Sequence, residues 1–349
     1  MRKQIRYING GLWLVLMVPL ALLSWKELSW PADSGRAWLD GRNARQIEGL
    51  YDEKFLMKDW ATNAWAALDY QLFNEGRPGV VVGQQGWLFS KEEFVWSPRE
   101  AANLQVALDE IAAVARQFSA ANIQLLPVLL PAKSEIYSEQ LVQVNPQLQA
   151  RLYDQALQGL ASRGVAVADL RPLLWRAAKQ QEVFLKTDTH WTPFGALRVA
   201  QWTAQQLGQE GDGQRFSTEP GEAKPYRGDL LNYIPVAPHF ENWGPDADLL
   251  ASPVTLDSGG GDDLLADVPA ITRLLIGTSY SANDAWNFAG AIKQATGADW
   301  VNYAEQGKGP FQPMRTWLAD NPLANTEIRQ VLWEIPVRYL VQPLPTPAS

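Results

Sequence analysis

Only two histidines could supply a catalytic imidazole, and one of them has an acidic neighbour at a useful spacing. His190 follows Asp188 by two residues in the polar segment 186–192. In extended backbone, residues i and i+2 project to the same side, so Asp188 could accept the Nδ1 proton and leave Nε2 as a general base. The alternative is that Asp188 and Thr192 only cap the helix that follows. His239 lies in a segment without periodicity and is predicted to be structural or exposed.

Any nucleophile must be a hydroxyl, because the chain contains no cysteine. The best candidate is Ser279, which follows an apolar run ending at Gly277 and precedes a predicted helix. Open α/β sheets bind ligands at the carboxyl ends of their strands, and the N–H groups at a helix start can stabilise an oxyanion. Ser281 is a weaker candidate because it lies two residues further into the turn. A serine that only caps the helix is the alternative.

The elements that must position these residues alternate between strands and helices. The patterns predict a hairpin over 79–89 and strands over 123–130, 165–170, 183–185, 273–277, 300–304 and 331–335. Helices are predicted over 40–75, from the capping box 97–100 to Phe118, over 146–162 and 172–180, from Thr192, and over 283–296 and 311–319. Residues 210–270 show no sustained periodicity, and 257–263 is predicted to be a surface loop. This alternation indicates an α/β fold with a mainly parallel sheet and helices on both faces.

Composition excludes several classes of protein. Hydrophobic residues make up 46% of the 349 residues, which is enough for a substantial core and argues against disorder. The net charge of −8 argues against nucleic-acid binding. Without cysteine there is no disulfide, iron–sulfur cluster or thiolate zinc site. The 16 tryptophans could stack on sugar rings, although most are expected in the core.

The N-terminus has the pattern of a membrane signal. Residues 8–25 contain no charge and follow Arg2, Lys3 and Arg6. As a helix they would be roughly 27 Å long, just short of a bilayer core, and the basic residues predict a cytoplasmic N-terminus. We expect a signal anchor or a cleaved signal peptide at 1–25, a linker at 26–39, one domain at 40–341 and a tail at 342–349. The body is then periplasmic, tethered to the inner membrane or soluble if the signal is cleaved.

Two of these motifs together resemble a known family. Gly277-Thr278-Ser279 resembles the Gly-Asp-Ser block of SGNH hydrolases, with threonine in place of aspartate. Paired with the upstream Asp-x-His-Trp at 188–191, it is similar to the alginate O-acetyltransferase AlgJ/AlgX family. Five further segments fit that pattern: 83–89, 131–133, 227–230, 307–310 and 333–340. The resemblance covers roughly residues 40–341, and because little chain follows for a carbohydrate-binding module, the AlgJ branch is the closer one.

The resemblance implies an SGNH-hydrolase-like (flavodoxin-like) fold in which the acid–base pair precedes the serine. It implies acetyl transfer to a bacterial exopolysaccharide such as alginate through an acetyl-serine, with neither a cofactor nor a metal. It also implies an MBOAT-type membrane partner that delivers acetyl groups and other polysaccharide biosynthesis and export proteins. Ser279, His190 and Asp188 would form the triad, and candidate oxyanion donors are the Ser279 backbone N–H, Asn283 and Asn302.

An acidic chain should repel a polyuronate, so alginate would require a locally basic groove. Cationic residues in or beside the matching segments are the candidates for substrate binding: Lys133, Arg227, Lys308, Arg315 and Arg338. A neutral polymer such as cellulose remains an alternative acceptor.

Three other functions remain open on the sequence alone. An esterase or deacetylase would use the same triad with water as the acceptor. A metal-dependent hydrolase could use Asp188 and His190 as ligands, although the chain has few further nitrogen or sulfur ligands. A non-catalytic, membrane-tethered scaffold that binds polysaccharide is the third.

Overall fold

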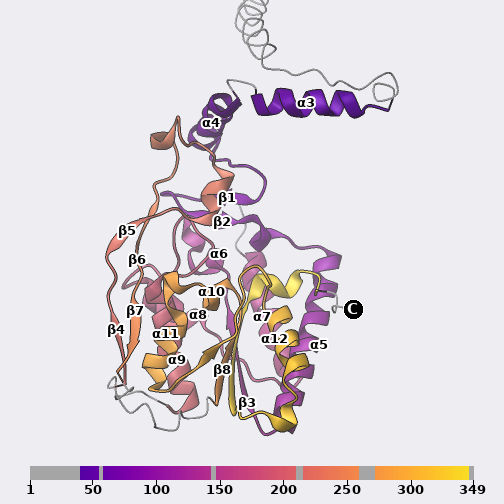
Figure 1. Cartoon of the computed structure of the whole chain (residues 1–349), viewed down its shortest axis with the longest axis vertical. Helices are drawn as coiled ribbons and strands as arrows, with labels where there is room; N and C mark the ends of the chain where they lie inside the picture. Colours follow the sequence, from indigo (N-terminus) through magenta and orange to yellow (C-terminus); the bar gives the residue numbers. More distant parts are fainter. Residues whose placement is uncertain (1–39, 55–57, 143–146, 210–214, 259–271, 346–349) are drawn as a thin grey trace, which may run out of the picture. The chain divides into compact units, whose positions relative to one another are not determined.

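The computed structural model describes residues 40–54, 58–142, 147–209, 215–258 and 272–345 (Figure 1). The predicted membrane segment and linker, and most of the predicted loop 257–263, lie outside these residues. Within the described part, no helix combines the length and the apolar character needed to cross a bilayer. The chain divides into two compact units, Met1–Phe73 with Ile234–Gly244 and Asn74–Tyr233 with Pro245–Ser349. All candidate site residues except His239 belong to the second unit.

The described residues of the first unit between 40 and 73 are mainly helical, as the predicted helix over 40–75 leads one to expect. It contains α3 (Arg42–Lys54), α4 (Lys58–Leu68), the π-helical turn η1 (Asp69–Phe73) and the short 3-10 helix η5 (Glu241–Trp243). Asn63 Nδ2 donates to the Pro235 carbonyl at 2.6 Å, and the Trp60 ring lies edge-on to Phe240. These contacts join α4 to the segment 234–244. His239 is exposed in this segment, one of the two environments that its sequence context predicts.

The second unit is built on the predicted parallel sheet. Its strands are β3 (Gln124–Leu130), β10 (Gln330–Pro336), β8 (Arg273–Ile276) and β9 (Val301–Asn302), hydrogen-bonded in that order and all parallel. Alternate residues of the central strand β10 enter opposite cores: Val331 and Trp333 face one, and Leu332 faces the other. A sheet buried on both faces explains why its strands read as near-continuous apolar runs.

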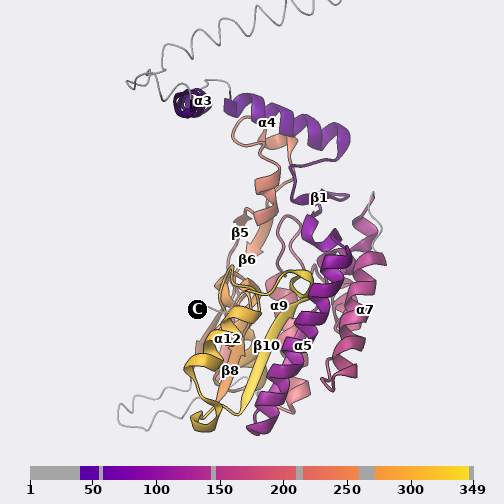
Figure 2. The same cartoon turned by 90° about the vertical axis from the view of Figure 1, so that its right-hand side faces the viewer.

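Helices cover both faces of this sheet (Figures 1 and 2). The first core packs against α5 (Pro98–Ala120), α7 (Gln147–Ser162), α12 (Phe311–Asp320) and η8 (Val337–Val341). The second packs against α8 (Arg171–Ala178), α9 (Pro193–Leu207) and α11 (Phe288–Thr296). Local chemistry fixes the helix starts: Ser97 caps α5 and Thr192 caps α9, each followed by proline at the first position.

The second unit also contains a hairpin and several short helices. The predicted hairpin is present as β1 (Val80–Val82) paired antiparallel with β2 (Leu88–Ser90). The remaining short helices are η2 (Lys91–Phe94), α6 (Lys133–Ile136), η3 (Ser138–Gln140), η4 (Asp229–Tyr233), α10 (Ser279–Ala282), η6 (Asp284–Trp286) and η7 (Leu323–Asn325).

Several predicted elements were wrong. Residues 165–170 are irregular, and 183–185 forms a single bridge, Phe184 to Trp191, because the chain reverses at once through the loop 186–190. The predicted helix over 283–296 is interrupted by Asn287, whose φ of 52° lies in the left-handed region. The predicted strand over 300–304 shortens to β9. The irregular region 210–270 contains four unpredicted strands in two antiparallel pairs: β4 (Phe216–Glu219) with β7 (Val254–Asp257), and β5 (Ala223–Tyr226) with β6 (Asp248–Ala251).

Candidate active site

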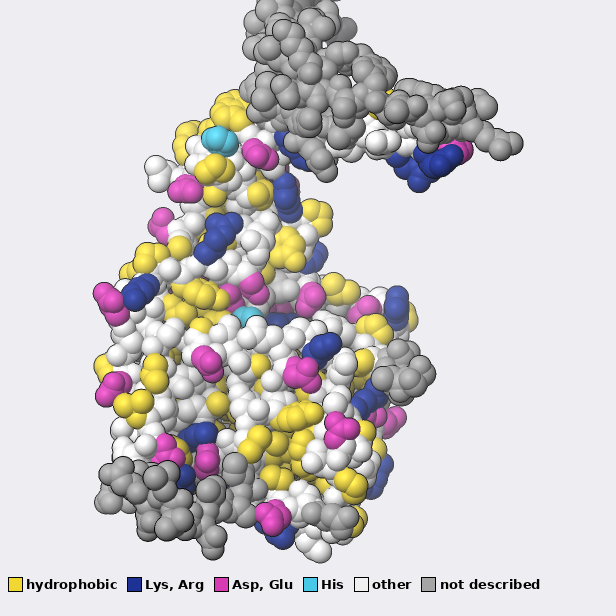
Figure 3. Space-filling view, viewed as in Figure 1, with side chains coloured by type: hydrophobic (Ala, Val, Ile, Leu, Met, Phe, Trp, Pro, Cys, Tyr) yellow, Lys and Arg dark blue, Asp and Glu magenta, His cyan; other side chains and the backbone are white. Residues whose placement is uncertain are grey.

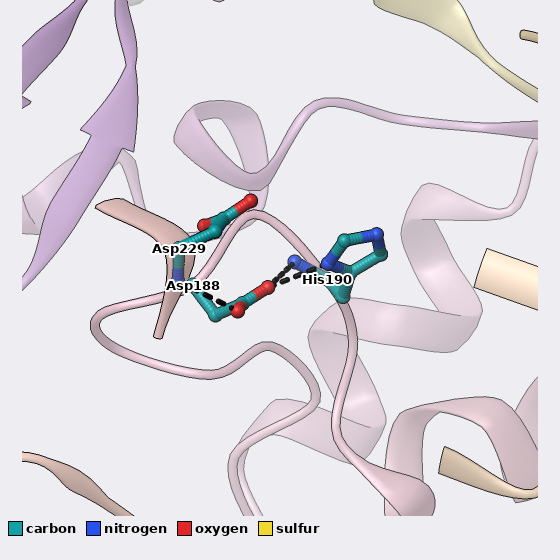
Figure 4. Close-up of side chains that lie close together, drawn as sticks. All are labelled: Asp188, His190 and Asp229. Carbon is teal, nitrogen blue, oxygen red and sulfur yellow. Dashed lines mark hydrogen bonds and ion pairs between the residues drawn. The ribbon is translucent and has the colours of Figure 1, made fainter. Parts of the chain in front are cut away.

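The structure brings the three predicted side chains together. Ser279 Oγ lies 2.6 Å from His190 Nε2, and His190 Nδ1 lies 2.6 Å from Asp188 Oδ1. A carboxylate only accepts, so Nδ1 carries the proton and Nε2 is free to accept from the serine hydroxyl. Figure 4 shows the imidazole with Nδ1 turned to Asp188 and its other nitrogen on the far side of the ring. The side chain of Asp188 is 1% exposed and that of His190 is 12% exposed, so the imidazole reaches solvent and its carboxylate partner does not.

Asp188 is held by several donors at once. The backbone N–H groups of His190 and Asp229 donate to its two oxygens at 2.9 Å, and Tyr226 OH donates at 3.2 Å. Burial alone would raise the pKa of Asp188, but the hydrogen bond and charge of His190, with these N–H donors, bring that pKa below its usual range. Asp188 therefore stays ionised and keeps the imidazole in one tautomer and one orientation.

The loop that carries Asp188 is fixed by two further carboxylates. Asp229 accepts from the Thr189 N–H at 2.9 Å and from its hydroxyl at 2.7 Å (Figure 4 shows Asp229 beside Asp188). Asp248 accepts from the N–H groups of Lys186 and Thr187 at 2.8 and 2.9 Å. Both carboxylates come from the region without periodicity, at the start of η4 and on β6.

Two aromatic rings pack against the imidazole. Trp286 stacks on His190 with centroids 4.6 Å apart, and its Nε1 donates to the Ser279 carbonyl at 2.9 Å. The Tyr280 ring lies 4.7 Å from the imidazole, and its hydroxyl donates to the Thr189 carbonyl. One tryptophan thus contacts both the base and the nucleophile's backbone.

The turn before Ser279 is supported by a carboxylate inside the core. Glu334, on β10 and fully buried, accepts from the Thr278 N–H at 2.8 Å and from the Ser281 hydroxyl at 3.0 Å. Thr278 caps α10 by accepting from the Tyr280 N–H. Burial raises the pKa of Glu334 to about 7, against the lowering effect of its hydrogen bonds to Thr278 and Ser281. Because Ser281 is engaged with Glu334 and Ser279 faces the imidazole, the geometry favours Ser279 as the nucleophile.

The predicted oxyanion donors differ in their availability. The Ser279 N–H stands at the start of α10 and donates to no described residue. Asn302 donates to the Ser281 carbonyl at 2.8 Å and accepts from the Ala304 N–H, so its amide is already engaged. Asn283 uses its Oδ1 to cap η6. Capping through Oδ1 does not use the Asn283 Nδ2, so the Ser279 N–H and this amide are the two candidates left to meet a developing oxyanion.

Of the five predicted substrate-binding cations, three bond groups of the protein and two are exposed. On the face shown in Figure 3, basic side chains are scattered among acidic ones. Arg315 pairs with Glu110 at 2.7 Å between α12 and α5, in the layer against the other face of the sheet. Arg338 is 8% exposed and donates to Tyr280 OH at 3.2 Å. Arg227 and Lys308 are exposed, so a role for them in substrate binding stays a prediction.

Lys133 differs most from its expected role. It is 2% exposed, and its ammonium donates to the carbonyls of Leu88, Lys186 and Asp188 at 2.6, 2.8 and 2.9 Å. An ammonium has three protons to donate. All three are directed inside the protein, so Lys133 has none left for a substrate.

The metal alternative can be compared with the same atoms. One ligand atom each from Asp188, His190 and Asp229 lies within 4.8 Å of the others, a spacing that could accommodate a cation. However, the His190 nitrogens face Asp188 and Ser279, while Asp229 binds Thr189 with both oxygens. The potential ligand atoms of these three side chains are therefore engaged in hydrogen bonds within the protein.

The sequence did not reveal that five further residues support the site: Tyr226, Asp229, Asp248, Trp286 and Glu334. Asp229 and Glu334 lie in segments recognised as family-like, at 227–230 and 333–340, but nothing in those segments indicates a contact with Asp188 or Thr278. Asp248 and Tyr226 lie on strands that were not predicted.

A serine–histidine–aspartate relay beyond the end of β8 in a parallel α/β sheet defines a serine-dependent acyl-transfer enzyme of the SGNH-like fold. The chain belongs to the family described as "SGNH hydrolase-like domain, acetyltransferase AlgX", whose model matches residues 80–337. This confirms the predicted family and the coarse fold.

Individual relatives agree with this assignment. The chain is 40% identical over 348 residues to the probable alginate O-acetylase AlgJ of Pseudomonas fluorescens, covering 97% of this chain and 88% of that one. The solved O-acetyltransferase domain of Pseudomonas putida AlgJ matches with 38% identity and a TM-score of 0.68, covering 77% of this chain and 94% of that chain. Pseudomonas aeruginosa AlgX shares the fold at 22% identity, with a TM-score of 0.55 over 75% of this chain and 63% of that chain.

Proposed function

We propose that this protein transfers acetyl groups to hydroxyls of a bacterial exopolysaccharide, alginate or a related polymer, through an acetyl group on Ser279. The observation that carries the proposal is the relay from Ser279 Oγ to His190 Nε2, 2.6 Å, and from Nδ1 to Asp188, 2.6 Å. The names of relatives at about 40% identity, probable alginate O-acetylases, support the acetyl group and the polymer.

In the first half-reaction, Ser279 attacks the donor. Its hydroxyl proton passes to His190 Nε2 as Oγ bonds to the acetyl carbonyl carbon, and the Ser279 N–H stabilises the oxyanion. The tetrahedral intermediate then releases the leaving group, which takes the proton from Nε2. Asp188 stabilises the imidazolium present between these two transfers.

In the second half-reaction, the glycan is the nucleophile. A sugar hydroxyl gives its proton to Nε2 while its oxygen bonds to the acetyl carbon. Ser279 Oγ leaves as the alkoxide and recovers the proton from the imidazolium, so the enzyme returns to its starting state. Water in place of the sugar would give a deacetylase with the same relay.

The experiment that tests the proposal supplies an aryl acetate with and without mannuronate oligomers. We expect acetylated oligomers in the product mass spectrum, formed by the wild-type protein and not by Ser279→Ala. Free acetate as the sole product, with oligomers present, would identify an esterase. Unchanged turnover by Ser279→Ala would refute the nucleophile assignment.

The polymer itself needs a separate test, because the net charge of −8 opposes a polyanion and the basic side chains on the face in Figure 3 are scattered. Isothermal titration with mannuronate oligomers and with cello-oligosaccharides separates the two acceptors. We expect heat from the mannuronate oligomers and none from the cello-oligosaccharides. Binding of the neutral glycan alone would exclude alginate.

Location and partners follow as part of the same proposal. We place the catalytic body in the periplasm, tethered by residues 8–25, where an MBOAT-type membrane protein supplies acetyl groups and other alginate proteins meet the polymer. The uncharged run at 8–25 behind three cationic residues supports this orientation. N-terminal sequencing of membrane-extracted protein decides between an anchor, which retains residues 1–25, and a cleaved signal.

A further inference from the structure

Lys133 has no part in the proposed chemistry, yet it is one of the most deeply buried cations of the second unit. It begins α6, separated by two residues from the end of β3, and is 2% exposed. Burying an ammonium is costly unless its charge and all its donors are satisfied. Lys133 thus places a charged group, which is costly to bury, at a position that an apolar side chain of similar size could occupy.

The three bonds of Lys133 join two segments that are distant in sequence. One acceptor, the Leu88 carbonyl, lies on β2, while the Lys186 and Asp188 carbonyls lie on the loop that carries the catalytic pair. Leu88 also donates its N–H to the Lys186 carbonyl at 2.9 Å. The ammonium thus closes a junction between the hairpin and the loop.

Asp188 is fixed by this junction at its main chain. Its carbonyl accepts from Lys133 at 2.9 Å, and its side chain accepts from His190 and Asp229. The backbone of Asp188 sets where the carboxylate stands, and the carboxylate sets the direction of the imidazole. A shift at the Asp188 carbonyl is therefore transmitted to Nε2 and the serine.

We propose that the Lys133 ammonium is a positioning residue of the acyl-transfer site, which holds the loop 186–188 against β2 so that His190 faces Ser279. This inference rests on the proposed function, because its effect is read through the activity of the Ser279 relay. It replaces the predicted contact between Lys133 and a substrate.

The surroundings of the ammonium explain why a cation is stable there. Four carboxylates act on its charge: Glu93 on η2, Asp188 in the loop, Asp229 on η4 and Asp248 on β6. The rings of Trp87 and Phe89 lie 5.2 and 5.3 Å from Nζ, and the Lys186 ammonium shares the Trp87 ring at 6.0 Å. Burial nonetheless outweighs these acids and lowers the pKa of Lys133 to about 8.

Because Lys133 can lose its proton, its role predicts a pH dependence that a purely apolar packing role would not produce. A neutral amine has one donor fewer than an ammonium, so the junction weakens as pH rises above about 8. In the unfolded chain the pKa of this lysine has its ordinary value of 10.5. Between these pH values the unfolded state binds more protons, so the contribution of Lys133 to folding stability rises with pH. Activity and this stability contribution should therefore change in opposite directions.

The test compares the full-length wild type with Lys133→Met, Lys293→Met and Ser279→Ala. Methionine keeps the volume of the side chain and removes the charge and the donors. Lys293, whose ammonium pairs with Asp299 at 2.7 Å, receives the same change away from the loop 186–188. The measurements are initial rates on an aryl acetate from pH 6 to pH 10, corrected for spontaneous hydrolysis, and thermal unfolding over the same range.

We expect Lys133→Met to lose about 100-fold in kcat while remaining folded, since displacement of a catalytic group by about 1 Å costs that much. Lys293→Met should match the wild type. The wild-type rate should fall reversibly above about pH 8 while its Tm rises relative to that of Lys133→Met. The residual rate of Lys133→Met should lack this alkaline fall.

A rate for Lys133→Met within threefold of wild type would overturn the inference. If that variant does not fold, the wild-type profile decides: a reversible alkaline fall in folded protein supports the inference, and a rate that stays constant to pH 10 overturns it. Ser279→Ala separates this inference from the function. An inactive Ser279→Ala beside a fully active Lys133→Met removes only the role of Lys133, whereas an active Ser279→Ala removes both.

Discussion

The indole of Trp286 lies parallel to the imidazole of His190, with ring centroids 4.6 Å apart and planes inclined by 18°. The same indole donates from Nε1 to the Ser279 carbonyl at 2.9 Å. One buried side chain therefore fixes the plane of the base and the backbone of the nucleophile together. A catalytic relay spread over distant segments needs such a shared support, because each segment is held by different parts of the core.

Replacing Trp286 with phenylalanine should lower activity more than stability. Phe retains an aromatic face for His190 but has no donor for the Ser279 carbonyl, and one hydrogen bond is worth about 1 kcal/mol. We expect kcat on an aryl acetate to fall about fivefold. Trp317→Phe, a tryptophan of the other core, is the matched control and should leave the rate unchanged. Equal losses in the two variants would show that the effect is general.

Replacing Asp188 with asparagine should remove most of the activity without unfolding the protein. Asparagine can offer Nδ1 an amide donor, which favours the tautomer that cannot accept a proton from Ser279. We expect a loss of about 10³ to 10⁴ in kcat, measured on an aryl acetate, with the far-UV circular dichroism unchanged. Activity within tenfold of wild type would mean that His190 does not depend on Asp188 for its orientation.

Gly228 tests the contact between the 227–229 turn and the catalytic loop. A Cβ at this position would stand 2.2 Å from the Thr187 carbonyl oxygen, so Gly228→Ala must displace the turn whose Asp229 N–H donates to Asp188. We expect at least a tenfold loss of activity. Gly49→Ala, which meets nothing within 4 Å, should behave as wild type. A fully active Gly228→Ala would show that this turn does not position Asp188.

Glu334 should make stability depend on pH in a predictable direction. Burial raises the pKa of this carboxyl to about 7, whereas its pKa in the unfolded chain is 4.5. Between pH 4.5 and 7 the native state therefore binds more protons than the unfolded state. Its contribution to stability therefore falls as pH rises through this window. Glu334→Gln does not titrate, so its Tm relative to wild type should rise from pH 4.5 to 7. The exposed Glu222→Gln is the control, and parallel curves for wild type and Glu334→Gln would contradict the assignment.

The sheet and the relay could be predicted because their signals are local. Apolar runs specify β3, β8 and β10, and a serine after such a run falls at the edge of the sheet where ligands bind. Two residues of spacing suffice to place Asp188 beside His190. The meeting of His190 with Ser279, 89 residues apart, was expected from family resemblance and not from periodicity.

The supporting residues could not be predicted, because their roles depend on tertiary contacts. Asp248 lies on β6, a strand without alternating hydrophobicity, and its partner Thr187 is 61 residues away. Lys133 was expected to bind substrate because it lies in the family-like segment 131–133 and a polyuronate would require a basic groove. Only the structure shows three carbonyls converging on its ammonium.

The most direct test of the central claim is to trap the acyl-enzyme. Wild-type protein is mixed with an aryl acetate, quenched in acid within its first turnovers, digested and analysed by tandem mass spectrometry. We expect one added acetyl group on Ser279, absent from Ser279→Ala and lost when mannuronate oligomers are added before the quench. An acetyl group on another residue that turns over at the catalytic rate, or steady turnover by Ser279→Ala, would contradict it.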